Sequence, residues 1–190
     1  MSKTVPFVVK SREGKVLIEV AGPNFLDGHD LRRADFSGQQ LEGIDFSDCD
    51  LREADLSGAD LYWAFAFRAN FGDAILRNAR LSGANLVQAS FRNADLRGAR
   101  ISYDNLGGGP NLVGADFSRA LLDGAGLDGC EYDDTTIFPD GFDPATHGMT
   151  YVTPERFYVR PGSFASANLD PGHYIPDKKN PGFPVLWKKN

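Results

Sequence analysis

The stretch that decides the fold is Ala54-Asp55-Leu56-Ser57-Gly58-Ala59-Asp60-Leu61, in which Ala-Asp-Leu returns after five residues. The same period runs from Leu26 to Leu106 and, after a change of phase at Gly107-Gly108-Gly109-Pro110, from Leu112 to Ile137. A period of five fits neither an α-helix nor a flat β-strand, and sustained self-similarity is typical of stacked repeats. The sequence therefore predicts a solenoid of short, similar units.

Two positions of every five are apolar. One holds a large residue, usually Leu or Phe, and the position two before it holds a small one, usually Ala. Residues two apart in extended chain share a face, so we expect both to point inward. The other three positions are mostly Asp, Asn, Ser, Arg and Gly, which suit turns and solvent. This register places Leu81, Leu106 and Ile137 in a thin core.

The repeat between residues 24 and 137 resembles the pentapeptide repeat family. The resemblance implies an all-β fold, a right-handed quadrilateral parallel β-helix with four pentads in each coil. Seventeen pentads precede the glycine-rich insertion and six follow it, so we expect about six coils.

The two flanks of the repeat predict caps. In residues 1–23, β-rich runs at 5–9 and 16–20 read as a β-hairpin that covers the open end of the β-helix, in preference to a binding role. In residues 138–190, a Pro/Gly/Phe segment resembles the cap that follows the last coil in the family. The rest of this part, rich in Pro and aromatic residues, is expected to pack along the rod as extended chain. The dimerising C-terminal helix of gyrase-targeting members has no counterpart here.

Composition limits the cellular setting. No run of the 190 residues approaches the length of apolar sequence that a membrane span requires, and no signal-peptide pattern follows Met1. The two cysteines, Cys49 and Cys130, fall at small inward positions about four coils apart, beyond disulfide reach. Buried free thiols fit a reducing compartment. We therefore expect a cytoplasmic protein.

The net charge of −6 is unevenly distributed. Residues 62–103 carry six arginines against two aspartates, whereas the repeats before and after this basic waist are strongly acidic. Phosphate affinity needs a basic field, so the sequence argues against nucleic-acid binding by the surface as a whole.

Stacking at intervals of 20 residues, as the family fold implies, gathers arginines in the basic waist. Arg80 and Arg100 fall in one column beside Asp60, and Arg77 and Arg97 fall in the neighbouring column. Four guanidinium groups there would suit an acidic partner. The alternative is ion pairing with Asp60, Asp95 or the C-terminal segment, or simple solvation.

An aromatic cluster also breaks the repeat. Tyr62, Trp63, Phe65 and Phe67 occupy positions where pentads normally face water, and Ala66 takes the large inward position. An exposed cluster of this kind predicts a contact with a partner protein. The alternatives are cover by the chain's own C-terminal segment or a local slip of register that turns one Phe inward.

The sequence contains no pattern for catalysis. It has three histidines, no metal-ligand spacing and no Ser/His/Asp arrangement, and the recurring aspartates are explained as turn formers. The glycine-rich insertion lacks the Lys-Ser/Thr of a phosphate loop, so a bulge explains it better. We therefore expect no catalytic residue, no metal and no cofactor.

Two functions remain. The first is a non-catalytic protein–protein interaction module that uses Tyr62, Trp63, Phe65, Phe67, Arg77, Arg80, Arg97 and Arg100 to bind a protein partner. The second, implied by the resemblance to quinolone-resistance and self-immunity members, is a DNA mimic that acts on a type II topoisomerase such as DNA gyrase. The basic waist interrupts any acidic track, which favours the first.

Overall fold

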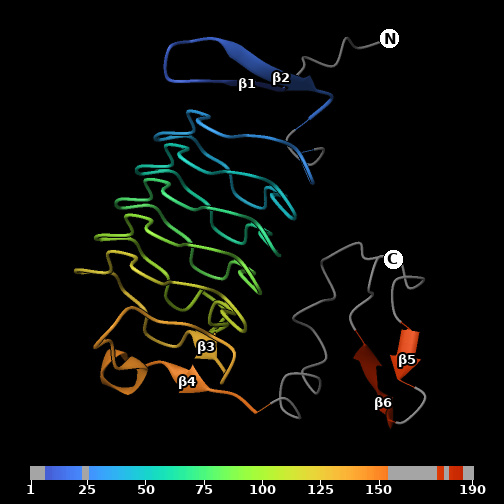
Figure 1. Ribbon diagram of the computed structural model, residues 1–190, viewed down its shortest axis with the longest axis vertical. Helices are drawn as coiled ribbons and strands as arrows, with labels where there is room; N and C mark the ends of the chain where they lie inside the picture. The colour runs from blue at the N-terminus through green and yellow to red at the C-terminus, as the bar shows by residue number, and fades with distance from the viewer. Residues whose placement is uncertain (1–6, 23–25, 154–174, 178–179, 186–190) are drawn as a thin grey trace. The chain divides into compact units, whose positions relative to one another are not determined.

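A computed structural model describes residues 7–22, 26–153, 175–177 and 180–185 (Figure 1). The chain divides into a unit of residues 1–151 and a unit of residues 152–190, and each is described on its own.

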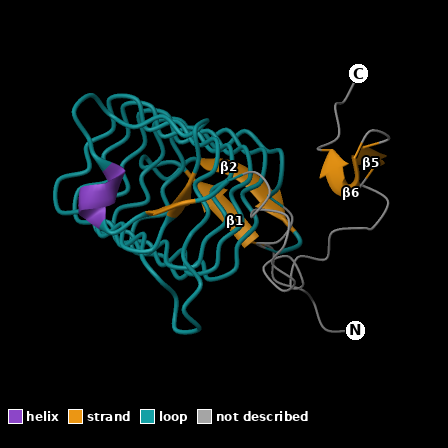
Figure 2. Ribbon diagram, turned by 90° about the horizontal axis from the view of Figure 1, so that it is seen from below, coloured by secondary structure: helices purple, strands orange, loops and turns teal. Residues whose placement is uncertain are grey.

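The repeat forms a stack of coils joined by a regular ladder of parallel bridges. Asp30 pairs with Asp50, Asp35 with Asp55, Gln40 with Asp60 and Asp45 with Phe65, and the next set begins at Asp50 with Asn70. Partners are therefore 20 residues apart, so four pentads complete one coil. Figure 2 shows the successive coils superimposed on one another.

Each pentad is built around one tight turn. In the pentad of Leu51, the Ala54 N–H donates to the Leu51 carbonyl at 3.1 Å, and Glu53 between them has φ 61°. Such a turn requires positive φ at its third residue, which explains the frequent Gly and Asn there. The Asp or Asn before the large apolar residue closes the turn, since Asp55 Oδ1 accepts from the Ser57 N–H at 2.9 Å. This local chemistry accounts for the recurring Ala-Asp-Leu.

The core is the line of inward residues expected from the period. Leu56, Leu61, Leu81 and Leu96 are buried, as are the alanines two positions before them. One side of the core holds a stack of phenylalanine rings. The ring centroids of Phe71 and Phe91 are 4.9 Å apart, and those of Phe91 and Phe117 are 4.8 Å apart. Cys49 and Cys130 are buried free thiols, as expected. Burial raises the pKa of Cys49 to about 12, which makes this thiol a poor nucleophile.

The position expected for Leu106 is wrong. From Asn85 to Arg100 the bridges pair residues 26 apart, as in Asn85 with Asn111 and Ser90 with Asp116, so the chain carries six additional residues rather than one. These residues leave the coil at one turn as a loop of residues 103–109, the corner loop, and Leu106 is 77% exposed. Six residues are one full pentad plus one residue, so their insertion displaces the apolar positions by one, as a single inserted residue would. The spacing of apolar residues alone therefore does not distinguish a six-residue insertion from a one-residue bulge.

The position expected for Ile137 is also wrong. Asp116 pairs with Ile137, 21 residues on, because one residue is added in the turn of residues 133–136. Ile137 is therefore half exposed, and Phe138 takes the inward place, stacked on Phe117 at 6.0 Å.

Both ends of the stack are occupied by non-repeat elements. Strands β1 (Phe7–Lys10) and β2 (Val16–Val20) form an antiparallel hairpin. The Asp35 N–H donates to the Lys10 carbonyl at 2.8 Å, and Val9 is buried against the core. At the other end, β3 (Glu131–Tyr132) pairs in parallel with β4 (Thr150–Tyr151), and a short 3-10 helix (Pro144–His147) precedes β4.

In the second unit, β5 (Ile175–Asp177) and β6 (Asn180–Val185) form an antiparallel pair. The expected packing of the C-terminal segment along the rod concerns residues that lie largely outside the described ones.

Candidate partner-binding surface

The aromatic segment keeps the register of the repeat. Phe65 bridges to Asp45 on one side and to Asn85 on the other, so no slip turns a Phe into the core. The expectation that all four aromatic side chains face water is nevertheless wrong for Tyr62, which is only 7% exposed. The corner loop covers it, because the Tyr62 hydroxyl donates to the Asn105 side chain. One member of the aromatic cluster, Tyr62, is therefore covered by the corner loop, which the sequence did not indicate.

Trp63 occupies the positive-φ position of its turn, with φ 54°. Gly43 and Gly83 hold the same position in the adjacent coils, with φ 67° and 72°. The Trp63 ring lies over Gly83, where an added Cβ would overlap it, and Trp63 Nε1 donates to Asp104 Oδ2 at 2.8 Å. Elsewhere in the repeat this position holds Gly or a polar or charged residue such as Arg33, also at positive φ. The Trp63 turn therefore departs from the repeat in its side chain and not in its backbone.

The corner loop is held by Asp104. Its Oδ1 accepts from the backbone N–H groups of Leu106 at 2.9 Å and Gly108 at 2.7 Å, while Oδ2 accepts from Trp63. Burial raises the pKa of Asp104, but these hydrogen bonds outweigh it and hold the pKa below its usual range. Asp104 thus ties the loop both to itself and to the Trp63 ring.

Around this turn lies an exposed apolar surface. Leu106 is 77% exposed, Tyr103 47% and Trp63 39%, and the Tyr103 ring lies over Gly129. In Figure 1 the corner loop belongs to the yellow segment that extends beyond the stack. We call Trp63, Tyr103 and Leu106, with Tyr62 beneath the loop, the aromatic corner.

Phe65 and Phe67 are less accessible than the sequence suggests. Both are half-buried, and the Arg68 guanidinium lies over the Phe67 ring, 4.4 Å from its centroid. Arg68 is in turn held by Asp48, with Nη2 2.6 Å from Oδ2. The outer face of Phe67 is therefore shared with an ion pair.

The four arginines divide into two pairs. Arg77 and Arg97 both donate to the Asp95 carboxylate, at 2.5 and 2.8 Å. The hydrogen bond from Arg97, opposed by partial burial and supported by Arg77, holds the pKa of Asp95 well below its usual range. Arg77 and Arg97 are therefore ion-paired within the chain, which was the alternative to binding an acidic partner.

Arg80 and Arg100 share a column, as expected, since Asp60 bridges to Arg80 and Arg80 bridges to Arg100. Arg80 lies over the Tyr62 ring, 4.2 Å from its centroid, and makes an ion pair of 3.2 Å with Asp60. Arg100 has no side-chain hydrogen bond or ion pair within the residues that the structure describes. This arginine column adjoins the aromatic corner through Tyr62.

Stacking at intervals of 20 residues places Tyr103 two coils on from Trp63 in the same column, but it does not indicate Asp104, Asn105 or Leu106 as parts of this surface. Leu106 fitted the period, and the glycines drew attention to 107–110 rather than to the residues before them. The available signal was the run Asp104-Asn105-Leu106, which stands where Ala-Asp-Leu would be expected and puts a charged residue at the small inward position.

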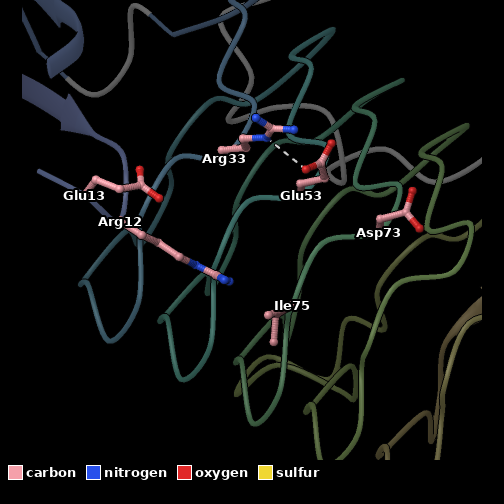
Figure 3. Close-up of a pocket in the computed structure, with 6 residues that line it drawn as sticks. All are labelled: Arg12, Glu13, Arg33, Glu53, Asp73 and Ile75. Atoms are coloured by element: carbon pink, nitrogen blue, oxygen red, sulfur yellow. Dashed lines mark hydrogen bonds and ion pairs between the residues drawn. The ribbon is translucent and has the colours of Figure 1, made fainter. Parts of the chain in front are cut away.

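A second feature is a charged hollow of about 230 Å³ beneath the hairpin, lined by Arg12, Glu13, Arg33, Glu53, Asp73 and Ile75 (Figure 3). Its charged groups pair with one another and with the coil: Arg33 with Glu53 at 2.9 Å and Arg12 with Asp55 at 3.1 Å. Figure 3 shows Arg12 reaching from the hairpin across the coils. We interpret this hollow as a solvated junction between hairpin and coils.

Within the described residues there is no group of three or more His, Cys, Asp or Glu side chains able to hold a metal ion. The helices of the same part of the chain are too short or too polar to cross a bilayer.

The chain belongs to the pentapeptide repeat family. The sequence model of pentapeptide repeats matches residues 30–65 and 67–102 with eight copies. The pentapeptide repeat protein Rfr23 from the cyanobacterium Cyanothece 51142 is 33% identical, with 56% of this chain and 65% of that one covered and a TM-score of 0.47. The protein alr5209 from Nostoc PCC 7120 is also 33% identical, with 65% and 84% covered and a TM-score of 0.29.

A more distant match is QnrB1, a plasmid-mediated fluoroquinolone resistance protein. It is 18% identical, with 67% of this chain and 75% of that one covered and a TM-score of 0.35. At this identity the match concerns the fold alone. No curated protein matches the sequence.

Proposed function

We propose that this protein is a non-catalytic protein–protein interaction module. A right-handed, four-sided stack of about six coils serves as a rigid scaffold, and the aromatic corner with the arginine column of Arg80 and Arg100 contacts the partner. Phe65, Phe67, Arg77 and Arg97 contribute less in this proposal, because the two rings are half-buried and the two guanidinium groups are paired with Asp95.

The exposed Trp63 supports this proposal most strongly. Tryptophan is enriched among the residues that dominate binding energy at protein interfaces. Here a positive-φ turn presents it, where the same turn in the adjacent coils holds glycine, and a hydrogen bond to Asp104 fixes it. A fixed aromatic ring loses little conformational entropy on binding. Departures from an otherwise uniform repeat tend to mark function.

The test is a capture experiment from lysate of the cells that make the protein. The intact chain is compared with Trp63→Ala and with Glu53→Gln, which alters a paired surface charge on another column. We expect a partner that binds the parent and Glu53→Gln and is lost with Trp63→Ala. An identical set of captured proteins for all three baits would contradict the proposal.

The alternative is a DNA-mimicking modulator of a type II topoisomerase, with DNA gyrase as the candidate partner. It would require a continuous track of free carboxylates. Several carboxylates on the coils are instead paired with arginine: Asp48 with Arg68, Asp60 with Arg80, and Asp116 with Arg92. A DNA gyrase supercoiling assay with added protein tests this alternative. Inhibition or protection of gyrase would favour it over the first function.

A further inference from the structure

We propose that the partner is an acidic protein segment whose apolar side chains pack against Leu106, Tyr103 and Trp63 and whose carboxylates pair with Arg100 and Arg80. This inference rests on the proposed function and names the chemistry of the partner.

The corner loop is dispensable for the coil. In the preceding coil the single residue Gly83 takes the place of residues 103–109, and the bridges resume in register at Asn111. Gly109 also lies so close to the Gly129 carbonyl that an added Cβ would overlap it, so the chain returns tightly to the stack. The six additional residues therefore do not serve the core or the ladder. Their contribution lies in what the loop presents outward.

The loop is preorganised around an exposed leucine. Besides the bonds to Asp104 Oδ1, the Asp104 N–H donates to the Gly108 carbonyl at 2.9 Å, and Asn105 is fixed by Tyr62. Leu106 stands between these anchors with 77% of its surface exposed. Burial of an exposed leucine side chain against a partner is favourable. Because hydrogen bonds already fix the loop, binding would cost little further conformational entropy.

The positive charge of Arg80 and Arg100 beside the corner loop favours an acidic partner. Arg80 and the corner loop contact the same Tyr62 ring, one through its guanidinium and the other through Asn105. Arg100 lies next in the column and three residues before Tyr103, and its guanidinium has no partner among the described residues. A partner that buries Leu106 therefore brings its surface against two guanidinium groups, and carboxylates satisfy them best.

The chain's own C-terminal segment lacks this complementarity. Residues 152–190 carry six Lys and Arg against three Asp and Glu, a net charge of +3. Like charges at an interface disfavour it, so the charge pattern argues for a separate, acidic partner.

The experiment selects binders from a displayed library of random peptides with the full-length protein as bait. We expect enrichment of Asp and Glu next to large apolar residues in the selected peptides. Leu106→Ser should weaken these peptides about tenfold, as should replacement of residues 103–109 by a single Gly. Arg100→Glu should shift the selection to peptides with Lys and Arg. Glu53→Gln is the control and should select the same peptides as the parent.

Three results would overturn the inference: selected peptides without acidic residues, no enrichment, or equal binding of the selected peptides to parent, Leu106→Ser and Arg100→Glu. A dimer in sedimentation that Leu106→Ser dissociates would make a second copy of the chain the occupant, against the proposal. A lysate partner lost with Trp63→Ala but retained by Leu106→Ser and Arg100→Glu would refute the inference and leave the proposed function standing.

Discussion

Two columns of this protein occupy the same position of the pentad and use it differently. One holds Arg33, Glu53 and Asp73, all at positive φ, and the other holds Gly43, Trp63 and Gly83. In the charged column, neighbours satisfy one another: Arg33 donates to Glu53 at 2.9 Å, and Asn93 donates to Asp73 at 3.0 Å. In the aromatic column, the Trp63 ring covers a glycine and binds a loop.

The turn conformation is the same in both columns, so the side chains and not the turn determine what each surface can bind. The backbone requires positive φ at this position in both columns, and side chains that pair along a column leave a closed, solvated surface. A tryptophan between glycines, followed by an inserted loop, leaves apolar surface that has no partner among the described residues.

The largest effect is expected from Leu81→Asp. Leu81 belongs to the pentad of Gly83 and is 1% exposed in the core, so the substitution buries an unpaired carboxylate. We expect the free energy of unfolding to fall by about 4 kcal/mol or more in urea denaturation.

Leu106→Asp is its matched control, because the five-residue period assigns both leucines to the core. Leu106 is exposed, so the control should change stability by no more than about 0.5 kcal/mol. If both variants lost the same free energy of unfolding, Leu106 would have to lie in the core, and the exposed position of Leu106 in the corner loop would be wrong.

The next effect is expected from Gly83→Ala. A Cβ at Gly83 overlaps the Trp63 ring and also meets positive φ, so we expect a loss of about 2 kcal/mol and a change in Trp63 fluorescence. Measured with Trp187→Phe as background, the emission reports Trp63 alone.

Gly43→Ala provides the comparison, since Gly43 has the same turn conformation and no atom within 4 Å of an added Cβ. It should cost about 1 kcal/mol from backbone strain and leave the fluorescence unchanged. If both variants shifted the emission alike, the packing of Trp63 on Gly83 would be wrong.

A smaller effect is expected from Asp95→Asn, which removes the shared acceptor of Arg77 and Arg97. We expect a loss of about 1 kcal/mol at neutral pH, since both arginines are partly exposed. The pKa of Asp95 is lower in the folded state than in the unfolded chain, so its contribution is complete above about pH 4 and is lost as pH falls through the folded pKa. The difference between parent and variant should therefore shrink in acid; a constant difference would show that charge is not its source.

The smallest effect is expected from Glu53→Gln in the charged column. Both partners of the Arg33–Glu53 pair are more than half exposed, at 72% and 52% of their side-chain surface. We expect a change of about 0.3 kcal/mol that disappears in high salt. A loss above about 1 kcal/mol would mean that this column stabilises the fold, and the contrast between the columns would weaken.

The repeat, the core and the turns could be predicted from the sequence because they are local and periodic. Ala54-Asp55-Leu56 specifies its own turn, and the period repeats it. Each wrong position arose where a residue was added. The six residues before Asn111 and the single residue before Ile137 each shift the phase by one, and phase alone does not report length.

The aromatic corner could be predicted only in part for a different reason. Trp63 stood out because it breaks the composition of the repeat. Its contact with Gly83 follows from the regular 20-residue ladder. Its hydrogen bond to Asp104 depends on where the corner loop leaves the coil, and these two residues are about forty positions apart. The ion pairs of Arg77 and Arg97 with Asp95 follow from the column arrangement and were among the expected alternatives.

The most direct test of the central claim is site-specific photo-crosslinking in the full-length protein. A benzophenone amino acid is placed at position 106 in the aromatic corner or at position 53 in the charged column, and the protein is irradiated in lysate of the cells that make it. We expect an adduct with a separate protein from position 106, none from position 53, and loss of the adduct when Arg100→Glu is added. Adducts from position 53 alone, or from neither position, would contradict that claim.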